Sequence, residues 1–228
     1  MKPLVAAVAV LVATSCGGAE RDLAETSSPA LETTDTLRAR AEQGDAEAQV
    51  NLGFRYATGE GVPQDAADAV RWFRLAADQG HAEAQFNLAL MYYNGEGVPQ
   101  DDAEAVRWWR LAADQGQAEA QYNLALMYDN GEGVPQDDVE AVRLYRLAAD
   151  QGLAQAQFNL ALMYYNGEGV PQDDVQALMW FNLTASRSTG EDRESAVSAR
   201  DRARARMTAE QVAEAQRLAR EWAEAHPR

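Results

Sequence analysis

The chain has 228 residues, of which 46% are hydrophobic and 25% charged, as is ordinary for a foldable soluble chain. Its formal net charge is −16, and Lys2 is its single lysine. Such an acidic chain repels a phosphate backbone, which argues against nucleic-acid binding and weakly favours basic or neutral partners. Cys16 is the single cysteine, so no intrachain disulfide can form.

The first fifteen residues have the pattern of a signal peptide. Lys2 supplies one positive charge, residues 4–12 form an apolar run, and small residues follow up to Cys16. The apolar run is too short to span a bilayer as a mature helix. We therefore predict that residues 1–15 are a signal peptide.

The segment "VATSC", residues 12–16, resembles the bacterial lipobox. The resemblance implies cleavage before Cys16 and lipidation of that residue, which would anchor the chain in a bacterial envelope, facing the periplasm. Gly17 after the cysteine favours the outer membrane. The alternative is an ordinary signal peptide cut after Ala19, which would leave a soluble periplasmic protein.

Residues 16–34 have no apolar period and are rich in Gly, Ser, Thr, Glu and Pro. This composition is typical of a flexible segment, so we predict a lipidated tether between the membrane and the folded body.

The next part of the chain is repetitive. Nearly the same segment, "MYYNGEGVPQDD" at Met91, occurs four times with its starts 36 residues apart, at Arg55, Met91, Met127 and Met163. A segment copied at a fixed period indicates one structural unit of a repeat array. We assign residues 35–187 to that array.

Each repeat predicts two helices joined by a short loop. In the second copy, residues 82–94 are mostly good helix formers, and Gly95 can take the positive φ that ends a helix. Asp101 with Glu104 forms the pattern of a capping box that opens a second helix over residues 102–115.

The two ends of the array predict caps. Residues 36–44 resemble the end of a second helix without its partner, and residues 188–228 predict two further helices. Ser188 with Glu191, and Thr208 with Gln211, have the capping-box pattern at the starts of these helices. Polar terminal units keep a repeat array soluble.

These motifs resemble the Sel1-like repeat, a relative of the tetratricopeptide repeat with a longer loop. The resemblance implies an all-α, right-handed α-solenoid of four 36-residue hairpins with N- and C-terminal helical caps. From the second copy onward Leu-Ala replaces Leu-Gly, and the fourth copy loses its closing Gln-Gly. In the first copy the motif residues are Leu52-Gly53, Tyr56, Gly59-Glu60-Gly61-Val62, Trp72 and Ala76-Ala77.

The glycine-rich loop does not have the pattern of a ligand site. Gly95-Glu96-Gly97 lacks the third glycine and the lysine of phosphate-binding loops, and no strand precedes it. The acids that follow lack the alternating spacing of calcium ligands. His81 and His226 are the two histidines, and neither has a second one at metal-ligand spacing. We therefore predict no cofactor and no metal.

A cell-wall enzyme is the alternative function. Some cysteine-rich Sel1-like proteins are described as penicillin-binding or β-lactamase-like, but this chain lacks the disulfide cysteines. It has no serine between Ser28 and Ser186, and the mature chain would contain no lysine, which removes a Ser-Lys dyad. We therefore predict a protein that is not an enzyme.

The remaining candidate is a binding surface on the first helices, which line the concave face of such arrays. By similarity to tetratricopeptide proteins, an asparagine before the motif leucine can bond the backbone of a bound peptide, because its amide is both donor and acceptor. We predict a scaffold or adaptor that binds a protein or peptide segment there. The alternative is that the aromatic residues pack against the neighbouring first helix and the asparagines make structural bonds. The predicted groove residues are Asn51, Phe86, Asn87, Leu90, Tyr93, Asn94, Tyr122, Asn123, Leu126, Asp129, Asn130, Phe158, Asn159, Leu162, Tyr165 and Asn166.

Overall fold

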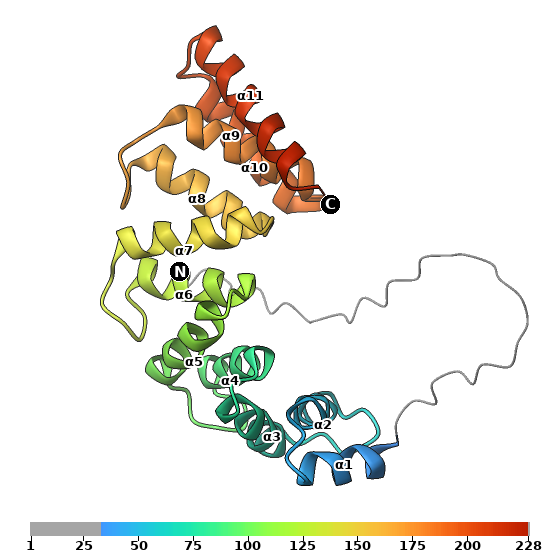
Figure 1. Ribbon diagram of the computed structural model, residues 1–228. Helices are drawn as coiled ribbons and strands as arrows, with labels where there is room; N and C mark the ends of the chain where they lie inside the picture. Colours follow the sequence, from blue (N-terminus) through green and yellow to red (C-terminus); the bar gives the residue numbers. More distant parts are fainter. Residues whose placement is uncertain (1–32, 228) are drawn as a thin grey trace, which may run out of the picture. The chain divides into compact units, whose positions relative to one another are not determined.

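The computed structural model describes residues 33–227, which form eleven α-helices and no strand (Figure 1). The predicted signal peptide, Cys16 and nearly all of the tether lie outside the described residues. The helices are α1 (Thr34–Glu42), α2 (Ala46–Thr58), α3 (Ala66–Asp78), α4 (Ala82–Asn94), α5 (Asp102–Asp114), α6 (Ala118–Asn130), α7 (Asp138–Asp150), α8 (Ala154–Asn166), α9 (Asp174–Arg187), α10 (Gly190–Arg204) and α11 (Ala209–Ala225).

The helices form a solenoid, as predicted. The four repeats are the hairpins α2–α3, α4–α5, α6–α7 and α8–α9, and each second helix also packs on the first helix of the following unit. One hydrophobic core runs through the hairpins, and a smaller cluster lies under α1, where Leu37 and Leu52 meet Trp72. No helix within residues 33–227 is long and apolar enough to cross a membrane.

The first glycine of each loop ends the first helix of its repeat. Gly95 has φ 71°, in the left-handed region, and its N–H donates to the Met91 carbonyl. The carboxylate of Asp101 then accepts from the backbone N–H groups of Ala103 and Glu104 at 3.1 and 3.0 Å, which opens α5. The predicted bounds of α4 are confirmed, and α5 ends one residue earlier than predicted.

The second glycine of the loop determines how closely adjacent repeats approach. Gly133 has φ 66°, and a Cβ atom there would overlap the backbone carbonyl of Asp102 at the start of the preceding second helix. The equivalent glycines meet the equivalent carbonyls: Gly97 meets Ala66, and Gly169 meets Asp138. The loop is therefore part of the contact between repeats.

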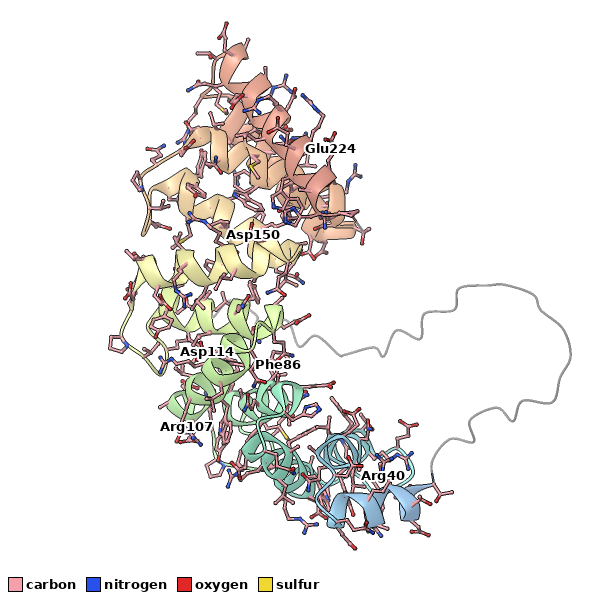
Figure 2. All side chains as sticks on the ribbon, viewed as in Figure 1. Arg40, Phe86, Arg107, Asp114, Asp150 and Glu224 are labelled. Carbon is pink, nitrogen blue, oxygen red and sulfur yellow. The ribbon has the colours of Figure 1, made fainter. Side chains whose placement is uncertain are left out.

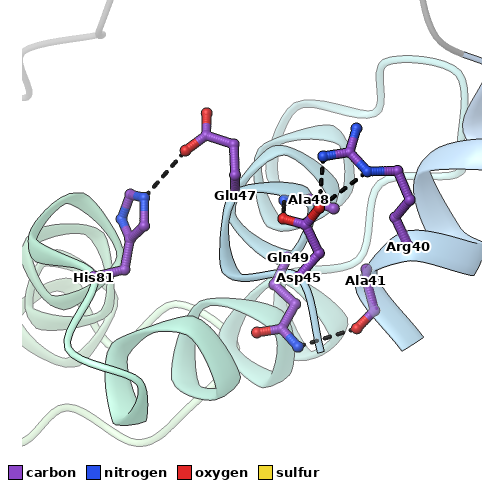
Figure 3. Close-up of polar contacts among 7 residues, drawn as sticks. All are labelled: Arg40, Ala41, Asp45, Glu47, Ala48, Gln49 and His81. Carbon is purple, nitrogen blue, oxygen red and sulfur yellow. Dashed lines mark hydrogen bonds and ion pairs between the residues drawn. The ribbon is translucent and has the colours of Figure 1, made fainter. Parts of the chain in front are cut away.

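Helix α1 caps the N-terminal end of the array through polar contacts (Figure 3). Arg40 pairs with Asp45, the N-cap of α2, at 2.6 Å. The side-chain amide of Gln49 donates to the carbonyl of Ala41 at 3.0 Å, and its oxygen accepts from Gln79 at 2.8 Å. Gln49 is buried, so these two bonds satisfy an amide inside the array.

The same glutamine pair recurs along the array but is incomplete in the fourth repeat. Gln85 with Gln115 and Gln121 with Gln151 repeat both bonds. Gln157 donates to Ala149 at 3.1 Å, but its oxygen has no hydrogen-bond partner among residues 33–227. Arg187, at the position equivalent to Gln151, instead donates to the His226 carbonyl at 3.0 Å and lies over the Trp222 ring.

One of the two predicted capping boxes at the C-terminal end is wrong. Ser188 is the C-cap of α9, where its N–H donates to the Thr184 carbonyl, and the N-cap of α10 is Thr189, without a side-chain cap. Ser188 is thus used to end one helix and cannot open the next. The capping box of Thr208 and Gln211 at the start of α11 is confirmed.

Candidate functional site

The predicted groove residues differ widely in their access to solvent. Phe86, Asn87 and Asn123 are buried, so a ligand cannot contact them in this structure, and Figure 2 labels Phe86 within the array. The exposed members are the asparagines Asn51, Asn94, Asn130 and Asn166. The half-buried members are Leu90, Tyr93, Tyr122, Leu126, Asp129, Phe158, Asn159, Leu162 and Tyr165.

The half-buried aromatic members pack on the second helix of their own repeat. The ring centroids of Tyr93 and Trp109 lie 5.5 Å apart, and those of Tyr122 and Tyr145 lie 6.0 Å apart. In the fourth repeat Phe158 lies 5.7 Å from the Phe181 ring. These side chains therefore contribute to the core, although part of each still reaches solvent.

Asp129 stands where repeats 2 and 4 have Tyr93 and Tyr165, and the structure gives this difference an internal reason. The hydroxyl of Tyr145 donates to a carboxylate oxygen of Asp129 at 3.0 Å. Trp109 and Phe181, which have no hydroxyl, occupy the position of Tyr145 in repeats 2 and 4 and contact Tyr93 and Tyr165 instead. The Tyr-to-Asp change thus accompanies a change on the second helix.

Burial sets the electrostatics of this pair. Burial raises the pKa of Asp129, opposed by the hydrogen bond from Tyr145 and reinforced by the nearby carboxylates of Asp138 and Glu168. Burial also raises the pKa of Tyr145, and the negative charge of Asp129 adds to this rise. At neutral pH the tyrosine therefore remains a proton donor.

Several asparagines of the predicted groove make structural bonds. The side-chain amide of Asn87 donates to the Glu83 carbonyl one turn earlier, at 2.7 Å. Asn94 donates to the Glu96 carboxylate at 3.3 Å. In repeat 4 the same bond joins Asn166 to Glu168 at 3.2 Å.

The C-terminal cap closes the end of the first-helix row. Arg206, which follows α10, lies over the Tyr165 ring with its guanidinium carbon 3.8 Å from the centroid. It also pairs with Asp174 and donates to the Tyr165 carbonyl at 3.3 Å. Arg206 therefore covers one face of the Tyr165 ring, whereas the hydroxyl of the equivalent Tyr93 contacts Glu132 at 3.5 Å.

Residues 33–227 hold no cluster of three or more His, Cys, Asp or Glu side chains with the geometry of a metal site. His81 is half-buried, and its Nε2 atom lies 3.2 Å from a carboxylate oxygen of Glu47 (Figure 3). It joins the first helices of two repeats, a structural contact that the sequence alone did not indicate.

The predicted site residues do not include the exposed leucines of the second helices. Leu75, Leu111 and Leu147 are 43%, 40% and 41% exposed, at the same position of three successive repeats. The 36-residue period could have indicated them, because leucines that recur at one exposed position of each repeat form an apolar patch that marks an interaction surface.

The match to known families agrees with this geometry. The Sel1 repeat model matches residues 46–81, 82–117, 118–153 and 154–188. The chain belongs to the Sel1 repeat family. Sel1 repeat proteins are generally protein-interaction scaffolds and are typically not enzymes.

Two solved Sel1 structures are similar to this chain. The protective antigen c5321 of uropathogenic Escherichia coli is 34% identical, with a TM-score of 0.74 over 83% of this chain and 40% of that protein. A Sel1 repeat protein from Oxalobacter formigenes is 31% identical, with a TM-score of 0.66 over 85% of this chain and 75% of that protein. The chain thus spans less than half the length of the first of these proteins. A comparison with curated proteins finds no match.

Proposed function

We propose that this protein is a non-enzymatic scaffold that binds an extended protein segment on the face formed by its first helices. The observation that carries the proposal is a row of three Leu-Asn pairs. Each pair combines a half-buried leucine with an asparagine that is exposed four residues later, and the pairs recur every 36 residues. The pairs are Leu90 with Asn94, Leu126 with Asn130, and Leu162 with Asn166.

The chemistry of this row suits an extended segment. A partly exposed leucine offers apolar area, and an amide offers a donor and an acceptor, which a peptide unit can match. The three Leu-Asn pairs lie on the first helices of successive repeats, so they would contact one segment at regular intervals. We propose that the binding takes place at a bacterial envelope, with the chain anchored through Cys16 and the array facing the periplasm.

Photo-crosslinking tests the binding face. A photoreactive amino acid placed at Asn94 or Asn130 in the full chain, in its native cells, should give one defined crosslinked species. The matched control is the same amino acid at Ala213, an exposed residue of α11. Equal crosslinking at Ala213, or no crosslinked species from either asparagine, would overturn the proposed face.

A substitution experiment tests whether the row contributes affinity. Changing Asn94, Asn130 and Asn166 together to alanine should reduce recovery of the crosslinked partner in a pull-down, while the helical circular-dichroism signal stays unchanged. Because all three side chains are exposed, their loss should not disturb folding. Undiminished recovery would mean that the partner binds elsewhere.

A further inference from the structure

The second helices carry a surface that the proposed function does not use. On α3, α5 and α7, two arginines and one leucine lie at i, i+3 and i+4 and remain exposed. We refer to these nine residues as the second-helix stripe. Figure 2 labels one of them, Arg107, at the surface of the array. The stripe consists of Arg71, Arg74, Leu75, Arg107, Arg110, Leu111, Arg143, Arg146 and Leu147.

Hollows lie beside the leucines of the stripe. A cavity of about 360 Å³ between the second and third repeats is lined by the apolar side chains of Leu144 and Leu147. Its charged lining residues are Arg110, Asp114 and the ion pair of Arg143 with Glu140. A second cavity, of about 330 Å³, lies beside Leu75. Each is large enough to accept a leucine or an aromatic side chain from another helix.

The fourth repeat indicates what kind of partner fits. Leu183, equivalent to Leu147, is only 3% exposed, and α10 and α11 both pack on its helix, α9. Trp222 of α11 packs edge-on against Trp180, the equivalent of Leu144, with ring centroids 5.7 Å apart. Both covering helices place small alanine side chains against the array: Ala196, Ala199, Ala203, Ala215 and Ala219 are buried.

The charge on the stripe changes where the chain covers it. The positions of Arg143 and Arg146 hold Met179 and Asn182 in α9. A buried guanidinium without a counter-charge is costly, so neutral side chains suit a stripe that α10 and α11 cover. Repeats 1 to 3 keep their arginines.

One arginine per repeat has a neutral partner. Arg110 donates to the hydroxyl of Tyr128 at 2.7 Å and Arg146 to that of Tyr164 at 2.5 Å, and Arg74 makes the same bond to Tyr92. None of these three guanidinium groups forms an ion pair within the part of the chain that the structure describes. Carboxylates on a covering helix would therefore find these three guanidinium groups without an ion pair.

We propose that the second-helix stripe binds an acidic amphipathic helix of a partner protein. The helix places a leucine or tryptophan in the hollow beside Leu147 and carboxylates against Arg74, Arg110 and Arg146. This docking repeats, at the exposed repeats, the contact that α11 makes with α9. It uses a different face from the Leu-Asn row and does not depend on it.

Three peptides test the chemistry of the partner. The probe is a fluorescent peptide with the sequence of residues 209–225 and the changes Arg217→Glu and Arg220→Glu, which retains Leu218 and Trp222. One control peptide keeps both arginines, and another is the acidic peptide with Leu218→Ala and Trp222→Ala. Fluorescence anisotropy with the full chain should show saturable binding of the acidic probe, weakened by salt. Each control should bind about tenfold or more weakly.

Variants of the protein locate the site. Arg110→Gln with Arg146→Gln, or Leu111→Ser with Leu147→Ser, should weaken binding of the acidic probe about tenfold or more. The control pair Asn94→Ala with Asn130→Ala, on the first-helix face, should leave it unchanged. All of the substituted side chains are exposed, so the variants should fold. Circular dichroism checks that they do.

Three results would overturn the proposal. Either the acidic probe shows no saturable binding, or all three peptides bind equally well, or the stripe variants bind the acidic probe as well as the native protein does. Light scattering tests whether the stripe instead binds a second copy of this chain. If the chain forms a dimer, and the double variant Leu111→Ser with Leu147→Ser is a monomer, the proposal of a partner helix fails. If a photoreactive amino acid at Asn94 gives no crosslinked species while the acidic probe still binds, only the proposed function of the first-helix face is rejected.

Discussion

Tyr145 and Asp129 form a hydrogen-bonded pair, at 3.0 Å, in the position where the neighbouring repeats pair two aromatic rings. Tyr145 is fully buried, so its hydroxyl depends on this acceptor. A change that looks like a functional substitution on one helix is therefore matched by a change on the helix that packs against it.

Removing one partner of this pair should cost more than removing both. Asp129→Ala should lower the free energy of unfolding by about 1–3 kcal/mol, because it removes the carboxylate that accepts from the buried Tyr145 hydroxyl. The double variant Asp129→Ala with Tyr145→Phe should recover part of that loss. Urea denaturation of the four proteins of the double-mutant cycle measures the coupling. Additive effects of the two changes would show that the bond contributes little.

The same pair should make stability depend on pH. Burial raises the pKa of Asp129 above its ordinary 3.8, so the folded state binds a proton more readily than the unfolded state. The stability gained from this tighter proton binding is fully present below pH 3.8 and is lost as the pH rises through the higher pKa of the folded state. Relative to Asp129→Asn, the native protein should thus lose stability as the pH rises from acid to neutral. Urea midpoints of both proteins across this range test the sign, and a constant difference between them would contradict it.

The two kinds of glycine in the array should respond differently to alanine. Gly116 has φ 90° and no atom within 4 Å of an added Cβ, so Gly116→Ala should cost only the conformational strain, about 1–2 kcal/mol. Gly133→Ala should cost about 1–3 kcal/mol more, because its Cβ also meets the Asp102 carbonyl of the neighbouring repeat. Thermal or urea unfolding compares them. Equal losses would mean that the stacking of repeats relaxes freely.

The glutamine pairs should contribute unequally. Gln121→Ala removes two bonds and leaves the amide of Gln151 with only a long contact to the Leu147 carbonyl, so it should destabilise the chain by about 1–3 kcal/mol. Gln157→Ala removes one bond and one oxygen that has no hydrogen-bond partner, so its cost should be smaller. Both side chains are buried, which makes the comparison a matched one. A larger loss for Gln157→Ala would contradict this reading of the ladder.

The proposed lipid anchor makes a prediction for residues outside the described range. Cys16→Ala should move the protein from the membrane fraction to the soluble fraction, because two or more acyl chains each contribute about 0.8 kcal/mol per buried methylene. Fractionation of cells and intact-mass analysis measure the location and the added lipid. Ser15→Ala, next to the cysteine, is a control that should leave the protein at the membrane. Recovery of the native protein in the soluble fraction, without added lipid, would support the alternative cleavage after Ala19.

Part of the candidate site could be predicted from the sequence. The spacing placed Leu90 and Asn94 on one side of α4, and they are half-buried and exposed. It could not separate Asn87 from Asn94, because both follow an aromatic residue on α4 and only the tertiary structure shows that Asn87 is buried and Asn94 exposed. Nor could it reveal the bond between Asp129 and Tyr145, which lie sixteen residues apart on two helices.

The sequence by itself determined the repeats and the ends of their helices, because Gly95 and Asp101 act through local backbone conformation and nearby N–H groups. Tertiary structure decided which side chains remain accessible. Leu147 and Leu183 occupy the same position of two repeats, yet only Leu147 is exposed. The difference arises because α10 and α11 fold back onto α9, and burial depends on what packs against a helix as well as on the residues within it.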